Sequence, residues 1–188
     1  MFESLPIIMV DTNVWLDIYL PHRPGRQSAL ELLRLACNYD AAIVFPAQSV
    51  LDVYWQVMAD NKRWARESNR LTEELAVAAK RLAWECVHEM REIGTAIPVD
   101  SSDLYLADKF RDTHDDLEDD LVMAACQRSK ANYLVTRDRK LLGRAPIDAR
   151  TPKQMIELLR RGLASGTPMQ GDAKDESYWL LRWLGDKG

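Results

Sequence analysis

Cysteine and histidine are scarce in this chain of 188 residues, which contains three of each. The cysteines, Cys37, Cys86 and Cys126, are widely spaced, odd in number and surrounded by helix-forming residues. This pattern favours reduced, buried thiols and argues against disulfides or a zinc site. The histidines are too far apart in the sequence to form a recognisable pair of metal ligands, so surface or core positions are the better interpretation.

Long apolar runs and glycine-rich phosphate loops are also missing. No apolar stretch approaches the roughly 20 residues that a membrane-spanning helix needs. The segment after Met1 lacks the charged start and the cleavage site of a signal peptide. We therefore expect a cytoplasmic protein without membrane contact. The sequence contains no nucleotide-binding glycine pattern and no G-x-S-x-G nucleophile pattern.

Net charge gives little indication of function. The value of −4 does not indicate nucleic-acid binding, and 47% hydrophobic with 29% charged residues is typical of a globular protein. The charges are unevenly distributed, because acids are concentrated between residues 100 and 120 and Lys and Arg dominate residues 137–161. Local patches therefore have to carry the functional argument.

Short strand patterns alternate with longer helical patterns along the chain. Apolar runs predict strands over 6–10, 41–45, 95–99 and 132–136, with a fifth short strand fed by 145–147. Helical periodicity predicts helices over 28–39, from 47 past 57, over 62–93 with a break near 68–69, and over 104–110, 116–130 and 152–163. This alternation predicts parallel strands with helical crossovers, and hence an α/β fold of the three-layer α/β/α sandwich type.

The length suits one domain rather than two. We expect this domain over residues 1–164, with the long helical segment 62–95 inside it. A Gly-rich and polar linker and a Trp-rich amphipathic helix are expected over 165–188, where the helix would dock on the body or on a partner.

Carboxylates follow the predicted strands, at the sheet edge where parallel sheets bind ligands. Asp11 comes directly after the first predicted strand, and Asp138 follows the fourth. Asp52 lies in an apolar helical stretch shortly after the second. Asp116 and Asp119 open the helix before the fourth strand, three residues apart and therefore on one face.

Each acid also has a structural interpretation, which stays open when that acid is considered alone. Asp11 and Asp138 are each placed to cap a following helix. Asp116 and Asp119 match an N-cap and the third helical position, where the helix dipole favours acids. Asp52 is costly to bury among apolar neighbours, so it would face solvent or pair with an arginine.

Considered together, the acids favour a metal site. Carboxylates directed to one sheet edge repel each other unless positive charge compensates them. Hard divalent cations such as Mg²⁺ and Mn²⁺ bind carboxylate oxygens together with water and substrate phosphate. Such ions support in-line hydrolysis of phosphodiesters. The acids therefore predict a Mg²⁺ or Mn²⁺ site suited to nucleic-acid hydrolysis.

Three segments resemble motifs of the PIN-domain nucleases, in the family's order. They are VDTNV at 10–14 after an apolar strand, DLEDDLVMAA at 116–125, which is similar to the family's D-x-E-D-x-L helix, and NYLVTRD at 132–138, which is similar to its strand end. The resemblance covers the chain from about residue 7 to about residue 160. One D-T-N triplet is weak, whereas the ordered trio is fairly specific.

The resemblance implies a PIN-like ribonuclease with a defined set of acids. Asp11, Asp119 and Asp138 would surround one or two Mg²⁺ or Mn²⁺ ions. Asp52 matches a further catalytic acid, at a position where many members carry Glu and one subgroup that resembles this chain uses Asp. Asp116 matches an extra acid of that subgroup, acting on the metal through water or a neighbouring ligand.

Polar and basic neighbours complete the predicted site. By the same resemblance, Asn13 and Thr136 match polar positions that orient the strand-end acids. Arg137, Arg139 and Lys140 flank Asp138 in sequence, so they either hold substrate phosphates or form a solvated basic face.

Two aromatic residues, Trp15 and Tyr19, follow Asp11 by one and two helical turns. They are candidates for stacking on nucleic-acid bases. Packing in the core is the favoured interpretation.

The leading hypothesis is a Mg²⁺- or Mn²⁺-dependent endoribonuclease in the toxin role of a toxin–antitoxin pair. RNA, an antitoxin protein and a second copy of the chain are then its partners. The alternative is a catalytically weak PIN-like module that binds RNA or protein through the long helix and the tail. A third hypothesis, an aspartyl-phosphate phosphatase with Asp11 as nucleophile, needs a second acid two residues on, where this chain has Asn13.

Overall fold

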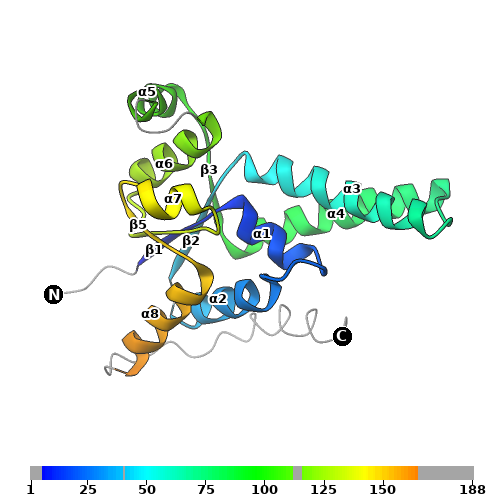
Figure 1. Cartoon of the computed structure of the whole chain (residues 1–188), viewed down its shortest axis with the longest axis horizontal. Helices are drawn as coiled ribbons and strands as arrows, with labels where there is room; N and C mark the ends of the chain where they lie inside the picture. The colour runs from blue at the N-terminus through cyan, green and yellow to red at the C-terminus, as the bar shows by residue number, and fades with distance from the viewer. Residues whose placement is uncertain (1–5, 40, 112–115, 165–188) are drawn as a thin grey trace.

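The computed structural model describes residues 6–39, 41–111 and 116–164. Within these ranges the chain forms one five-stranded parallel sheet at the centre of the molecule (Figure 1). The strands, in the spatial order β3–β2–β1–β4–β5, are β1 (Ile7–Val10), β2 (Ala42–Pro46), β3 (Thr95–Ile97), β4 (Tyr133–Val135) and β5 (Asp148–Arg150). The central strands are apolar and largely buried on both faces, as expected of a parallel sheet covered by helices.

Helices cover both faces of the sheet. They are α1 (Thr12–Tyr19), α2 (Arg26–Asn38), α3 (Ser49–Glu67), α4 (Glu73–Ile93), α5 (Ser101–Phe110), α6 (Leu117–Ser129), α7 (Arg139–Arg144) and α8 (Pro152–Ala164). Apolar side chains of α1–α4 and α8 form one cluster with the sheet, and those of α6 and α7 form a second cluster. Alternate residues of β1 supply the two clusters, Ile8 and Val10 to one and Met9 to the other. The predicted three-layer α/β/α sandwich is confirmed.

Four of the five predicted strands lie within two residues of the observed bounds. The fifth strand was expected to follow from residues 145–147, and β5 begins directly after them at Asp148, which pairs with Tyr133 of β4. Pro146 lies outside the strand, as expected of a residue that has no N–H to give to a strand ladder.

The predicted helix over 62–93 is two helices. Residues 62–67 continue α3, the chain reverses near the expected break, and α4 begins at Glu73. Asn69 adopts a left-handed conformation with φ of 51°, and the hydroxyl of Thr72 accepts the backbone N–H of Leu75 to cap α4. The result is a helical hairpin of α3 and α4 that projects from the body (Figure 1).

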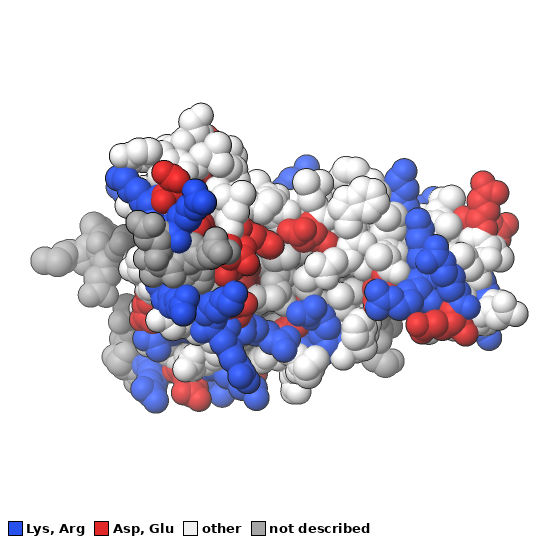
Figure 2. Space-filling view, turned by 45° about the horizontal axis from the view of Figure 1, so that its top comes forward, with Lys and Arg blue, Asp and Glu red and all other residues white. Residues whose placement is uncertain are grey.

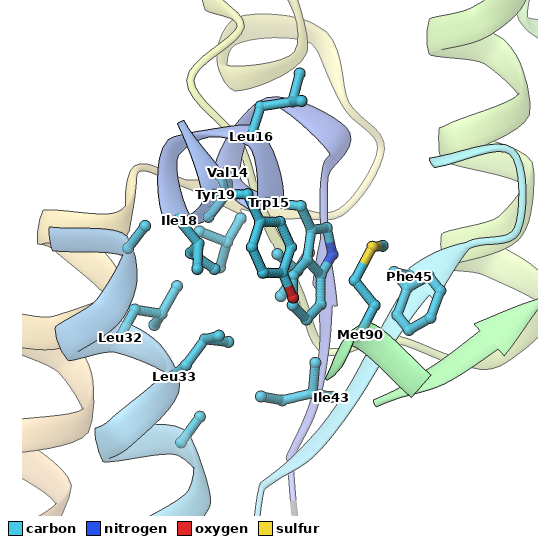
Figure 3. Packing of buried hydrophobic residues seen from close by; sticks show 14 of the residues in the cluster. Val14, Trp15, Leu16, Ile18, Tyr19, Leu32, Leu33, Ile43, Phe45 and Met90 are labelled. Carbon is cyan, nitrogen blue, oxygen red and sulfur yellow. The ribbon is translucent and has the colours of Figure 1, made fainter. Parts of the chain in front are cut away.

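The core around Trp15 fixes the start of α1. The Trp15 ring is fully buried, lies edge-on to Phe45 with ring centroids 5.5 Å apart and stacks on Tyr19 at 6.3 Å (Figure 3). Packing is therefore the confirmed role of both aromatics, and their burial excludes base stacking. Because α1 starts directly after Asp11, this packing also holds the end of β1 in place.

Two further predictions need comment. All three cysteines are free, but only Cys86 and Cys126 are buried. Cys37 is exposed, against expectation, because it lies near the C-terminal end of α2 on the side away from the sheet. Among the described helices none has the length and apolarity that crossing a bilayer requires. The expected linker and tail helix over 165–188 lie outside the described residues.

Candidate functional site

The sheet topology puts the predicted acids at its switch point. From β1, the chain builds β2 and β3 on one side and β4 and β5 on the other. Crevices beyond the carboxyl ends of strands at such a point are where open α/β sheets bind ligands. Asp11 follows β1 directly, and Thr136 and Asp138 follow β4.

The carboxylate of Asp11 does not cap α1. Asp11 occupies the N-cap position and its backbone carbonyl accepts from Val14 and Trp15, but its side chain makes no cap bond. Instead, Oδ2 accepts hydrogen bonds from the Thr136 hydroxyl at 2.6 Å and from the Asn13 amide. With only 6% of the residue exposed, Asp11 is a buried carboxylate held by donors from two strand ends. The capping interpretation therefore does not account for its side chain.

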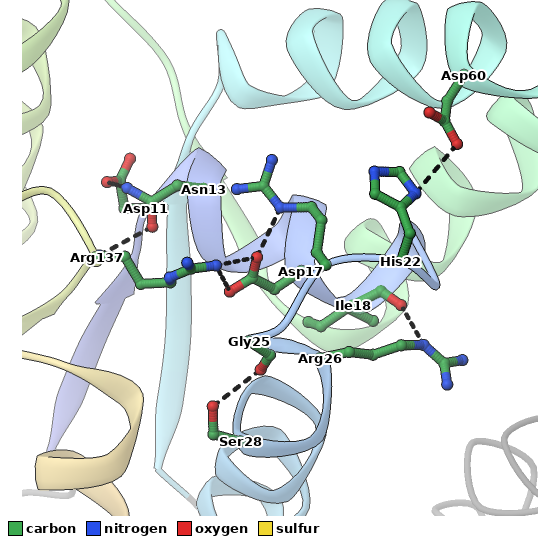
Figure 4. A network of polar contacts seen from close by, with 11 residues as sticks. Asp11, Asn13, Asp17, Ile18, His22, Gly25, Arg26, Ser28, Asp60 and Arg137 are labelled. Atoms are coloured by element: carbon green, nitrogen blue, oxygen red, sulfur yellow. Dashed lines mark hydrogen bonds and ion pairs between the residues drawn. The ribbon is translucent and has the colours of Figure 1, made fainter. Parts of the chain in front are cut away.

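Asn13 and Thr136 connect Asp11 to the segment after β4. The Thr136 hydroxyl donates to Asp11 and accepts from the Asn13 amide and from the backbone N–H of Asp138, each at about 3 Å. The Asn13 carbonyl oxygen accepts the backbone N–H of Arg137 at 3.0 Å (Figure 4). Both polar groups of the Asn13 side chain are therefore used: its NH₂ group donates to Asp11, and its oxygen accepts from Arg137.

Asp138 caps α7, as its structural interpretation proposed. Its Oδ1 atom accepts the backbone N–H groups of Lys140 at 2.6 Å and Leu141 at 3.2 Å. Its own N–H is held by Thr136, so the residue is fixed at both its backbone and its side chain. Both cap bonds involve Oδ1, which leaves a ligand role through Oδ2 compatible with capping.

A second group of acids comes from α3 and α6. Asp52 lies in the first turn of α3, and Asp116 caps α6 by accepting the N–H of Glu118 at 3.1 Å. Glu118 and Asp119 follow in the first turn of α6. Sequence reasoning assigned no role to Glu118, although it is the Glu of the D-x-E-D pattern.

Charge repulsion links the acids of the two groups. Burial raises the pKa of Asp11 from 3.8 to about 6. Hydrogen bonds from the Thr136 side chain and the Thr12 backbone oppose this rise, and repulsion from Asp119 and Glu118 adds to it. The pKa of Glu118 is raised by burial and then by the charges of Asp52, Asp116 and Asp119. Burial also raises the pKa of Asp52. Acids from β1, α3 and α6 therefore share one negative region.

A buried hydroxyl pair anchors the start of α3. Thr12 Oγ1 and Ser49 Oγ are 2.7 Å apart, and both residues are buried. This bond ties α3 to α1 three residues before Asp52, which places Asp52 relative to Asp11. No sequence pattern signals Ser49, because the contact joins positions 37 residues apart.

Arg137 has a structural contact that was not expected of a substrate-binding residue. Its Nη1 atom lies 2.5 and 2.6 Å from the carboxylate oxygens of Asp17, which is fully buried and also accepts from Arg23 at 2.7 Å (Figure 4). Gly25 lies directly against this contact, since a Cβ there would be 1.8 Å from Asp17 Oδ2. Arg139 and Lys140 are exposed in the first turn of α7.

The donor set suits a hard divalent cation. In the described part of the chain, no three His, Cys, Asp or Glu side chains stand close enough together to hold a metal ion. Mg²⁺ commonly uses only one or two protein carboxylates and keeps several waters or substrate oxygens. The shared negative charge around Asp11 is what such a cation would neutralise.

Comparison with known proteins identifies a family and one similar fold. A family model described as PIN domain matches residues 7–140, more than half of the chain. No curated protein sequence matches. Among solved structures, a chain in the crystal structure of VapBC2 from Rickettsia felis, bound to a DNA fragment from their promoter, is similar with a TM-score of 0.52. The match has 15% identity and covers 77% of this chain and 98% of that chain, so it shows the fold alone.

Proposed function

The chain belongs to the PIN-domain family, and we propose that it is an endoribonuclease that hydrolyses RNA phosphodiesters with Mg²⁺ or Mn²⁺. When bound, such a cation activates water and stabilises charge on the leaving oxygen. The proposed metal-holding acids are Asp11, Asp119 and Asp138, with Asp116 beside them, and Asp52 completes the catalytic acids.

One observation carries this proposal. Asp11 is a buried carboxylate that caps no helix and is held by two side-chain donors among other acids. A buried charge is unfavourable unless it is compensated, and the raised pKa of Asp11 is typical of functional sites. A cation ligand role explains both its burial and its fixed orientation.

The chain's own residues have distinct tasks in this mechanism. Thr136 and Asn13 orient Asp11, and Thr136 also holds the backbone of Asp138. Arg139 and Lys140 follow Asp138 at the open edge and would contact RNA phosphates. Arg137 would add to that contact only through the part of its side chain that Asp17 does not engage.

Asn13 argues against the phosphatase hypothesis. Its amide donates to Asp11 and accepts from the backbone of Arg137, so both its ends are engaged in bonds. A neutral amide in that position also lacks the proton-transfer ability that an aspartyl-phosphate mechanism requires two residues after its nucleophile.

The test compares Asp11→Asn and Asp119→Asn with the wild type in cleavage of an unstructured RNA with Mn²⁺ or Mg²⁺, and with EDTA. We expect wild-type cleavage that requires the metal, and loss of cleavage in both variants with thermal melting still cooperative. Asp148→Asn is the matched control, because Asp148 is exposed at the start of β5, the strand end away from the site. Full activity in Asp11→Asn or Asp119→Asn would contradict the proposal.

A binding module without catalysis is the second candidate. The observation that favours it is that no three described side chains stand ready to hold a metal ion. Calorimetric titration with Mn²⁺ separates the two functions. Heat of binding that disappears in Asp11→Asn supports the nuclease, whereas no heat with the wild type supports the binding module.

The toxin role is a further part of the proposal. It is supported by the fold likeness to a chain of VapBC2 and implies an antitoxin partner. Induced expression of the wild type would arrest growth of a bacterial host, and expression of Asp11→Asn to the same level would not. Equal growth with both would argue against toxicity.

A further inference from the structure

Four aromatic rings form a continuous row along α3 and α4. We call Tyr54, Trp55, Trp84 and His88 the aromatic strip. Successive ring centroids are 5.4 Å apart for Trp55 and Tyr54, 5.5 Å for Tyr54 and Trp84, and 6.0 Å for Trp84 and His88. Trp55 is 58% exposed and Trp84 is 50% exposed. Exposed rings that contact one another form a contiguous patch, and such a patch indicates a binding surface more than isolated exposed residues do.

The strip begins one helical turn from an acid of the candidate site. Asp52 precedes Trp55 by three residues, so the two side chains share a face of α3 about 4.5 Å apart along the helix axis. Asp52 in turn lies within electrostatic range of Glu118 on α6. The aromatic strip is therefore continuous with the acidic site.

The same face of α3 carries cations farther out. Lys62 and Arg66 follow Trp55 by seven and eleven residues, which returns them to the same face about 10 and 16 Å from Trp55 along the axis. Among the described residues neither forms an ion pair. Figure 2 shows one face of the molecule, on which acidic side chains near the body are followed by a largely uncharged stretch and then by a group of basic side chains, with further acids at the far end.

We propose that the aromatic strip binds unpaired bases of single-stranded RNA, while Lys62 and Arg66 hold its backbone phosphates. This rests on the proposed function, because it places the RNA chain next to the acids that would cleave it. Aromatic rings with flanking cations are the usual way in which proteins bind single strands without sequence preference. Trp55 and Trp84 are the residues that contact bases, and Tyr54 supports both rings from between them.

The charge pattern favours a nucleic acid over a protein on this face. The centres of protein interfaces are depleted of charged residues, whereas here a carboxylate and two cations share one stripe with Trp55. A duplex would not fit either, because its bases are stacked on one another and have no free faces. The proposal therefore predicts that single-stranded RNA binds more tightly than the same sequence in a duplex.

The test measures RNA binding without cleavage. The full chain is titrated into a fluorescein-labelled, unstructured RNA oligonucleotide in EDTA, and fluorescence anisotropy gives Kd. Trp55→Ala and Trp84→Ala are each expected to weaken binding about tenfold, and Trp55→Phe to keep most of it. Lys62→Ala and Arg66→Ala should each lower the slope of log Kd against log salt by about 0.7.

Trp64→Ala is the matched control. Trp64 is on the same helix and equally exposed, at 57%, but nine residues after Trp55 it faces the opposite side, about 180° away. Its replacement should leave Kd unchanged. Equal losses in Trp55→Ala and Trp64→Ala, or no loss in Trp55→Ala, would overturn the proposal.

Binding and cleavage outcomes separate this inference from the proposed function. RNA binding that depends on Trp55, without cleavage under any metal, would leave the strip proposal standing and contradict the nuclease. Metal-dependent cleavage with Kd unchanged in Trp55→Ala would support the nuclease and contradict the strip proposal. If Trp55→Ala alters the sedimentation mass and not the RNA affinity, the face is a contact between copies of the chain and the strip proposal is wrong.

Discussion

The candidate site has two halves that are built differently. The strand half comprises Asp11, Asn13, Thr136 and Asp138, and its groups are joined by hydrogen bonds across the ends of β1 and β4. The helix half comprises Asp52, Glu118 and Asp119 on α3 and α6. In this half, burial is the largest cause of the raised pKa of Glu118, and the charges of neighbouring carboxylates raise that pKa further.

The two halves should therefore respond differently to a bound cation. Donors such as Thr136 and Asn13 hold the strand half in place whether or not a ligand is present. In the helix half, the charges of Asp52, Asp116 and Asp119 raise the pKa of Glu118, and a bound cation would offset that repulsion. Loss of a hydrogen-bonding donor in the strand half should therefore destabilise the metal-free protein, whereas loss of a charge in the helix half should stabilise it.

The largest effect is expected from Thr136→Val. Thr136 is fully buried and its hydroxyl serves Asp11, Asn13 and the backbone of Asp138. Valine keeps the shape and leaves these groups without that partner, which should lower the free energy of unfolding by about 2–3 kcal/mol. The pKa of Asp11 should rise further, because the Thr136 hydrogen bond lowers it. Urea denaturation in EDTA measures the loss.

Thr95→Val is the control for Thr136→Val. Thr95 is an exposed threonine on β3, so its hydroxyl is solvated and its replacement should change stability by less than about 0.5 kcal/mol. If both variants lose the same stability, the hydroxyl of Thr136 does not hold the strand half together.

The strand half was predictable from the sequence because its contacts are made at strand ends. Asp11 and Asp138 directly follow apolar runs, and parallel strands bring such positions to one edge. Their partners Asn13 and Thr136 lie two residues away in sequence. The PIN-domain motifs cover the same positions, and the family match includes them.

The remaining features depend on tertiary paths that local patterns do not encode. The place of Arg137 beside Asp138 predicted either a phosphate contact or a solvated basic face, but its side chain contacts Asp17, 120 residues away in sequence. The outward position of Trp55, in contrast, follows from the helical spacing of α3. Val53 and Val57 are buried on α3, while Trp55 lies opposite them with Lys62 and Arg66.

The second effect is a pH dependence that belongs to Asp11. The ordinary pKa of its carboxyl group is 3.8, and in the folded protein this pKa is raised to about 6. The folded state therefore binds the proton more tightly than the unfolded state does. The contribution of Asp11 to stability is therefore present at low pH and is lost as pH rises through about 6. Between pH 5 and pH 7.5 the loss should be about 1.4 kcal/mol.

Asp11→Asn isolates this titration from that of other groups. In EDTA, the difference in unfolding free energy between wild type and Asp11→Asn is measured at pH 5 and pH 7.5. The unfolding free energy of the wild type relative to that of the variant should be lower at pH 7.5 than at pH 5. A difference that is the same at both values would show that Asp11 titrates normally and that the strand half does not hold it protonated near pH 5.

A smaller effect is expected at the link between the halves. Ser49→Ala removes one member of the buried hydroxyl pair that fixes α3 and leaves Thr12 unpaired. This should cost about 1 kcal/mol of stability and lower cleavage a few-fold by displacing Asp52. In the double variant Thr12→Val with Ser49→Ala, part of the stability should return, because neither hydroxyl is then left unpaired. Fully additive losses would exclude this link.

The smallest expected effect is a gain in stability, and it tests whether the helix half differs from the strand half. Glu118→Gln removes one of the repelling charges, and in EDTA at low salt it should raise the free energy of unfolding by a few tenths of a kcal/mol. The gain is small because Glu118 is exposed and screened by solvent, and 1 M salt should abolish it. Glu157→Gln on α8, where the side chain is also exposed, should show no gain. A loss of stability in Glu118→Gln would mean that both halves are held by hydrogen bonds, and that no repulsion awaits a cation.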